Sequence, residues 1–118
     1  MPSLSQLDPR FRPYAEALLA YARKLDPRFI VTSGRRSRGD QQRLYNAWLK
    51  GESPFPALPP GKSSHEIGLA VDIARLGVAA DQDPLLLQLG NAWQAAGGHW
   101  AGKGDPVHFA APLAWQRS

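Results

Sequence analysis

Hydrophobic residues recur with the period of an α-helix in three segments of the chain, residues 12–25, 39–51 and 83–98. In the first segment, Pro13 stands where an opening helical turn tolerates proline. The apolar positions of this segment are Ala15, Leu18, Ala22 and Leu25. We expect the first helix to face the core through these positions.

The second and third helices also carry end signals. Asp40 is the predicted N-cap of the second helix and Gly51 its C-terminal stop. Its apolar face is Leu44, Tyr45 and Trp48. Asp83 and Pro84 form a predicted N-cap and first-turn pair for the third helix. We expect this helix to pack through Leu86, Leu89, Trp93 and Ala96.

Three shorter segments are typical of β-strands. Residues 28–34 form a β-branched run that ends in a turn. Residues 68–74 alternate large apolar residues with small ones and Asp72, the period-2 pattern of a strand with one face in the core. The segment 99–110 has a glycine-rich turn followed by a strand in which His108 faces away from its apolar neighbours.

The segment 52–64, ESPFPALPPGKSS, contains four prolines and a glycine, so it is neither a helix nor a central strand. Irregular segments of this length in small domains are often functional, and we predict a loop that flanks the active site. Three helices and three or four short strands favour an α+β fold with a small, mainly antiparallel sheet. At 118 residues, the chain fits a single domain, 1–118.

Composition narrows the chemistry. The chain has no cysteine, which excludes a disulfide framework, a thiolate metal site and a cysteine nucleophile. A net charge of +4 favours anionic partners such as bacterial cell wall or nucleic acid. Without a recognition motif, we expect no specific nucleic-acid binding. The N-terminus lacks a signal-peptide pattern and no run reaches the roughly 18–20 apolar residues of a membrane span, so we expect synthesis in the cytoplasm. We also expect a monomer.

Three polar residues occupy positions that suit a metal site. Asp72 and His108 each interrupt a predicted strand whose opposite face is apolar, so both should lie away from the core. His65 precedes Gly68, where a turn would fold the imidazole over the same face. Two imidazoles and a carboxylate suit Zn²⁺ and leave a fourth position open for chemistry. By spacing alone, an aspartate bonded to neighbouring backbone and two ordinary histidines remain an alternative.

Three further polar residues have candidate roles. Asp105 lies three residues before His108, where its carboxylate could serve as general base and then general acid, although an Asp-Pro turn is also common. Arg36 ends a predicted strand and would bind a carboxylate or an oxyanion, unless it is surface charge. Glu66 is predicted to be solvated, because Leu69 stands where the HExxH zinc motif requires histidine.

The segments SGRRS, GKSSHEIGLAVDI and DPVHF resemble those of the zinc peptidases that cut peptidoglycan stem peptides. That family holds VanY-type D-Ala-D-Ala carboxypeptidases and phage L-alanyl-D-glutamate endopeptidases. The motif S-x-H-x-x-G-x-A-x-D matches from Ser63 to Asp72 without a gap, and the resemblance runs from about Leu18 to Phe109. It implies a hedgehog/D-Ala-D-Ala-peptidase-like fold, a Zn²⁺ cofactor and a peptidoglycan peptide as substrate.

The resemblance also implies roles for individual residues. The implied metal ligands are His65, Asp72 and His108. Asp105 is the implied catalytic acid/base, Arg36 binds substrate and stabilises the transition state, and Ser63 supports the site through a hydrogen bond. Ala110 stands where the family usually has an acidic residue.

The motif D-x-x-H has aspartate, Asp105, where the carboxypeptidases usually have glutamate, and in this it resembles the phage endopeptidase branch. The resemblance implies cleavage of the L-Ala-D-Glu bond. It also implies an endolysin that is released through a holin or carried in a phage particle. The alternatives are a D-Ala-D-Ala carboxypeptidase and a non-catalytic peptidoglycan-binding or phage structural module of the same fold. The chain has all five polar residues that catalysis would need, which favours an enzyme: Arg36, His65, Asp72, Asp105 and His108. A non-haem iron triad typically sets its carboxylate two residues from the first histidine, whereas the gap between His65 and Asp72 is seven.

Overall fold

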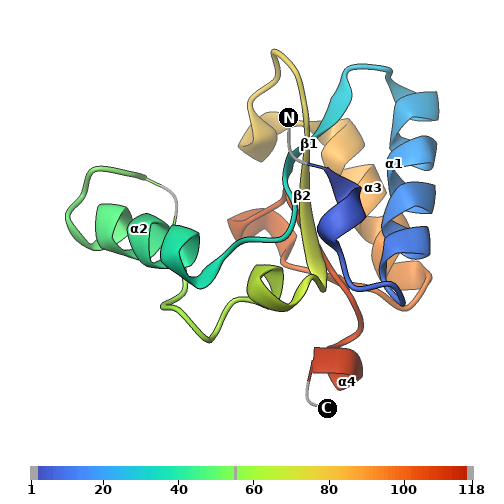
Figure 1. Ribbon diagram of the computed structural model, residues 1–118. Helices are drawn as coiled ribbons and strands as arrows, with labels where there is room; N and C mark the ends of the chain where they lie inside the picture. Colours follow the sequence, from blue (N-terminus) through green and yellow to red (C-terminus); the bar gives the residue numbers. More distant parts are fainter. Residues whose placement is uncertain (1–2, 55, 117–118) are drawn as a thin grey trace.

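The computed structural model describes residues 3–54 and 56–116 (Figure 1). The predicted domain 1–118 and the predicted loop 52–64 therefore include residues that lie outside the description, 1–2, 55 and 117–118. The elements in chain order are η1 (Leu4–Gln6), α1 (Arg12–Leu25), β1 (Phe29–Ser33), α2 (Arg38–Leu49), η2 (Ser64–Ile67), β2 (Ala70–Arg75), η3 (Ala80–Gln82), α3 (Pro84–Ala95), β3 (His99–Trp100), η4 (Gly102–Gly104), β4 (His108–Ala110) and α4 (Leu113–Gln116), where η denotes a 3₁₀ helix.

The four strands form one antiparallel sheet in the order β1-β2-β4-β3, which confirms the predicted α+β class. Helices α1 and α3 pack against the sheet on one side, whereas α2 projects on the other side (Figure 1). The core lies between the sheet and these two helices, and its fully buried strand residues include Phe29, Val71, Ile73 and Phe109. The opposite side of the sheet is therefore available for polar residues.

Helices α1 and α3 agree closely with the sequence prediction. Helix α1 has the predicted bounds and buries Ala15, Leu18, Leu19 and Ala22. Asp83 caps α3 as predicted, since its carboxylate accepts a hydrogen bond from the backbone N–H of Leu85 at 3.0 Å. The prediction that Ala96 packs against the core is wrong. It follows the last helical residue as an exposed C-cap, because the chain turns away there toward β3.

Helix α2 differs from the prediction at its start and in its packing. Its N-cap is Ser37 and not Asp40, because the Ser37 hydroxyl accepts a hydrogen bond from the Asp40 backbone N–H at 3.1 Å. Gln41 is the buried residue of this helix, whereas Leu44 and Trp48 of the predicted apolar face are each 40% exposed. The apolar face of α2 thus lies outside the main core.

A buried ion-pair network joins the far end of β2 to the start of α3. Arg75 donates from Nη2 and Nε to the two carboxylate oxygens of Asp83, at 2.7 and 3.1 Å, and from Nη1 to Asp26 at 3.0 Å. Asp83 is almost fully buried, and Arg75 is largely covered. The network fixes the end of the strand that carries Asp72.

We expect the substitution Arg75→Ala to lower the free energy of unfolding by about 3–5 kcal/mol, because it leaves the buried Asp83 carboxylate without its cation. Denaturant unfolding of the purified protein measures this change. The substitution Arg28→Ala is the matched control, since it removes an exposed guanidinium and leaves Asp26 paired with Arg75. It should cost much less stability, because exposed ion pairs contribute little. Equal losses in the two variants would contradict the importance of the buried pair.

Candidate active site

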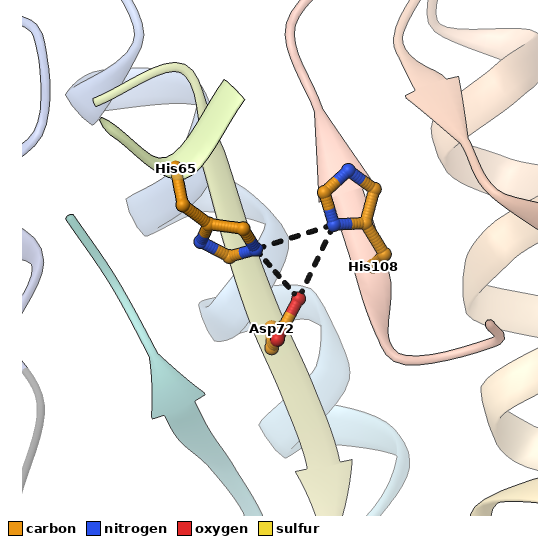
Figure 2. A group of neighbouring side chains, drawn as sticks. All are labelled: His65, Asp72 and His108. Atoms are coloured by element: carbon orange, nitrogen blue, oxygen red, sulfur yellow. Dashed lines mark hydrogen bonds and ion pairs between the residues drawn. The ribbon is translucent and has the colours of Figure 1, made fainter. Parts of the chain in front are cut away.

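The three predicted metal ligands converge on the side of the sheet away from the main core (Figure 2). His65 Nε2 lies 3.1 Å from Asp72 Oδ1 and 3.2 Å from His108 Nδ1, and His108 Nδ1 lies 3.4 Å from Asp72 Oδ1. Ligands that surround Zn²⁺ tetrahedrally at its usual bond lengths are separated by about 3.3 Å. The triangle formed by these three atoms therefore has the size that a zinc ion requires.

Strand pairing brings two of these residues together. Strands β2 and β4 are antiparallel, and their register sets Asp72 directly opposite His108. Side chains of opposite residues in such a pair project from the same face of the sheet. Residues that are 36 positions apart in the chain thus become neighbours as a consequence of the sheet register.

The turn η2 brings in the third residue. The Ser63 hydroxyl accepts a hydrogen bond from the backbone N–H of His65 at 3.2 Å, and Gly68 ends the turn in the left-handed conformation with φ +73°. A Cβ at Gly68 would lie 2.6 Å from the backbone nitrogen of Asp8, so only glycine fits there. Ser63 therefore supports the position of His65 through the turn backbone.

The tautomer of His65 indicates that the cluster is built for a cation. Its Nδ1 lies 2.9 Å from the Gly34 carbonyl oxygen, which only accepts hydrogen bonds, so Nδ1 carries the proton of the neutral ring. Nε2, the other ring nitrogen, faces the Asp72 carboxylate and His108. A histidine that donates its other ring N–H to a carbonyl is typical of metal ligands.

Asp72 is ionised in this environment and therefore able to ligate a cation. Burial by itself would raise the pKa of its carboxyl group, but the contacts with His108 and His65 outweigh burial and hold the pKa well below its ordinary value. Its second oxygen, Oδ2, accepts a hydrogen bond from Arg36 Nη2 at 3.1 Å. The two oxygens thus have separate partners.

Arg36 is held beside this cluster by hydrogen bonds from its side chain. Its Nε donates to the Ser33 hydroxyl at 2.9 Å and its Nη1 faces Gln41 Oε1 at 3.4 Å. Gln41 is 1% exposed and also donates from Nε2 to the Leu58 carbonyl at 2.7 Å. Sequence reasoning missed Gln41, because a glutamine on a helix has no pattern that distinguishes it from a solvated one.

Asp105 lines the same cleft, which has a volume of about 670 Å³ and also includes His65, Asp72, His108 and Arg36 among its lining residues. Partial desolvation, and then the negative charge of Asp72, raise the pKa of the Asp105 carboxyl group above its ordinary value. A carboxylate with a raised pKa is a better proton acceptor. The predicted site residues therefore all line one cleft, Ser63 included.

The prediction for Glu66 is wrong in one respect. Its side chain is 11% exposed rather than solvated, and its Oε2 accepts hydrogen bonds from the backbone N–H groups of Gly61 at 2.7 Å and Ser63 at 3.3 Å. Sequence reasoning missed these contacts because both donors are backbone groups.

Ala110 is almost fully buried and pairs with Ala70 and His99 across the sheet.

An α+β domain with two histidines and an aspartate gathered on one side of an antiparallel sheet has the architecture of a zinc peptidase. The sequence model of the VanY family, described as D-alanyl-D-alanine carboxypeptidase, matches residues 4–100. The chain belongs to the VanY family and is thus a zinc-dependent peptidoglycan peptidase, which confirms the resemblance. Asp105 and His108 lie beyond the matched residues. No curated protein sequence matches the chain significantly.

Solved structures share the fold. VanYB in complex with D-Alanine-D-Alanine has a TM-score of 0.68 and 25% identity, over 89% of this chain and 71% of that chain. A mutant of the vancomycin resistance D,D-pentapeptidase VanY in complex with Zn(II) has a TM-score of 0.66 and 25% identity, over 89% and 72%. The L-Ala D-Glu endopeptidase ChiX of Serratia marcescens has a TM-score of 0.66 and 22% identity, over 98% and 87%. The Zn(II) complex and the convergent ligand triangle confirm the predicted cofactor.

Among the described residues, no helix has the length and apolar character needed to cross a membrane.

Proposed function

We propose that this protein is an L-alanyl-D-glutamate endopeptidase that cuts the stem peptides of peptidoglycan. The observation that carries the proposal is Asp105, an aspartate in D-x-x-H that lines the cleft with the ligand triangle. This aspartate resembles the phage endopeptidase branch. An endolysin role, with release by a holin or transport in a phage particle, belongs to the same proposal. Action as a monomer is part of the same proposal.

In this proposal, His65 Nε2, Asp72 Oδ1 and His108 Nδ1 hold Zn²⁺, for which the ligand triangle has the right size. When bound, zinc polarises the scissile carbonyl and lowers the pKa of a water molecule. The Gly34 carbonyl keeps the His65 ring oriented, and Arg36 holds the second oxygen of Asp72. Both contacts keep the ligand atoms in place before substrate arrives.

Asp105 and Arg36 act on the substrate. The Asp105 carboxylate accepts a proton from the attacking water and then gives it to the leaving amine, for which its raised pKa is suited. Arg36 is 20% exposed to the cleft, so its guanidinium can bind a substrate carboxylate or the developing oxyanion while it stays anchored to Ser33.

A second candidate is D-Ala-D-Ala carboxypeptidase activity, which is favoured by the description of the matching family and by the ligand of the VanYB structure. Both reactions use the same hydrolytic groups, and they differ in which part of the stem peptide lies across the ligand triangle. The identity of the bond therefore has to be measured on the products.

We expect digestion of purified peptidoglycan with the zinc-loaded protein to create new N-terminal D-Glu residues, detected by mass spectrometry of the soluble muropeptides. Release of free D-Ala from stem peptides that end in D-Ala-D-Ala would instead establish the carboxypeptidase. Zinc-free protein prepared with a chelator serves as the control and should leave the muropeptides unchanged. No cleavage of any stem peptide would contradict both candidates.

A further inference from the structure

Glu66 connects the turn that carries His65 to the irregular segment 52–64. Its Oε2 accepts hydrogen bonds from the backbone N–H groups of Gly61 at 2.7 Å and Ser63 at 3.3 Å. The Ser63 hydroxyl completes a capping box, because it accepts a hydrogen bond from the backbone of the turn. Hydrogen bonds to an ionised carboxylate are stronger than those between neutral groups. The side chain that follows His65 is thus committed to the backbone of this segment.

The glycine at 61 makes this attachment possible. Gly61 has φ +86°, which favours glycine, and a Cβ there would lie 2.8 Å from Arg38 Nη2. The Arg38 guanidinium therefore covers Gly61 while its Nε lies 4.0 Å from Glu66 Oε1.

A second attachment lies three residues earlier. The Leu58 carbonyl accepts a hydrogen bond from Gln41 Nε2 at 2.7 Å, and the oxygen of the same amide faces Arg36. The segment is consequently tied at Leu58 to the side chain that contacts Arg36, and at Gly61 to the residue adjacent to His65. Both attachments lead directly to residues of the proposed site.

The attached segment contributes apolar residues to the cleft lining. Together with α2, it contributes Leu44, Pro56, Ala57 and Leu58. Leu58 is 56% exposed, so contacts with the core do not hold it in place. Its position against the cleft depends on the two polar attachments.

We propose that Glu66 is a positioning residue that holds the segment 56–63 as a preformed wall of the substrate cleft. The proposal rests on the proposed function, because the wall is taken to contact the stem peptide. It gives a role to Glu66, which the proposed function leaves without one. Glu66 acts through the Gly61 and Ser63 backbone and touches neither the metal triangle nor the substrate.

The test compares Glu66→Ala with Glu66→Gln, because glutamine keeps an oxygen that can accept both N–H groups. In Glu66→Ala we expect KM for a stem peptide to rise about tenfold with kcat changed less than twofold, as a loss of preorganised binding requires. Glu66→Gln should restore KM to within about threefold of the wild type. Glu16→Ala, which removes an exposed glutamate on α1 outside the cleft lining, is the charge-matched control and should leave KM unchanged.

Hydrogen exchange of the zinc-loaded protein separates positioning from general stability and from the proposed function. In Glu66→Ala, the peptide that contains Gly61 and Ser63 should exchange about tenfold faster or more, while the peptide of β2 keeps the wild-type rate. Unchanged exchange at Gly61 and Ser63, or equal acceleration in β2, would overturn the proposal. This measurement needs no turnover, so it decides the positioning role even if the wild-type protein cuts a different bond or none of the peptides tested.

Discussion

Replacing Asp105 with asparagine should lower kcat for stem-peptide hydrolysis by about 10²–10⁴-fold, the usual contribution of a positioned general acid/base. Asparagine has almost the same shape but accepts no proton at neutral pH. Because Asp105 lies outside the ligand triangle, zinc content should stay at one ion per chain and the melting temperature should change little. Steady-state kinetics together with metal analysis measure these effects.

The exposed Asp81 in η3 offers the matched control for this substitution. Asp81→Asn changes the net charge by the same amount but affects a residue that does not line the cleft. It should retain kcat within about twofold, as surface substitutions normally do. An Asp105→Asn variant with wild-type kcat would show that another group carries the proton.

Replacing His65 with alanine should abolish stoichiometric zinc binding and, with it, hydrolysis. Loss of a residue that merely supports a ligand costs about 10–100-fold in metal affinity, and loss of a ligand should cost more. Removal of the fully buried imidazole ring also leaves the Gly34 carbonyl without its hydrogen-bond donor. We therefore expect an additional loss of about 1–3 kcal/mol in the stability of the zinc-free protein. Metal analysis after dialysis and denaturant unfolding measure the two effects.

The other histidines make this prediction specific. His108→Ala should also lose zinc, but it should destabilise the zinc-free protein less, since this side chain is 18% exposed. His99→Ala is the matched control, because His99 lines the cleft without belonging to the ligand triangle, and it should retain one zinc ion per chain. Equal zinc loss in all three variants would refute the assigned ligand set.

The comparison of α2 with α3 shows what local patterns were able to predict. At α3, one strong N-cap precedes a proline, so the start of the helix was unambiguous. At α2, Ser37 and Asp40 are both good N-caps, and the residue that caps the helix depends on how the chain leaves β1. The exposed apolar face of α2 depends in turn on the cleft beneath it, which periodicity does not encode.

Glu66 and Gln41 show why part of the site stayed hidden. Their partners are backbone groups of Gly61, Ser63 and Leu58, which every residue type presents alike and which leave no signature in the sequence. The three proposed ligands could be picked out from the sequence because zinc chemistry requires particular side chains. Contacts with the backbone depend on where the chain passes, and only the fold specifies that.

The sequence by itself determined the residue types and their faces: a strand with Asp72 opposite the apolar core, a glycine that turns His65 back, and DPVH with its second histidine. Tertiary structure alone decided that Asp72 stands opposite His108, that the second oxygen of Asp72 binds Arg36, and that Glu66 ties down the wall of the cleft. The physical reason is the separation along the chain over which each kind of interaction acts. Periodicity and turn chemistry act over a few residues, whereas strand register and the packing of the 52–64 segment join positions that are distant in the chain.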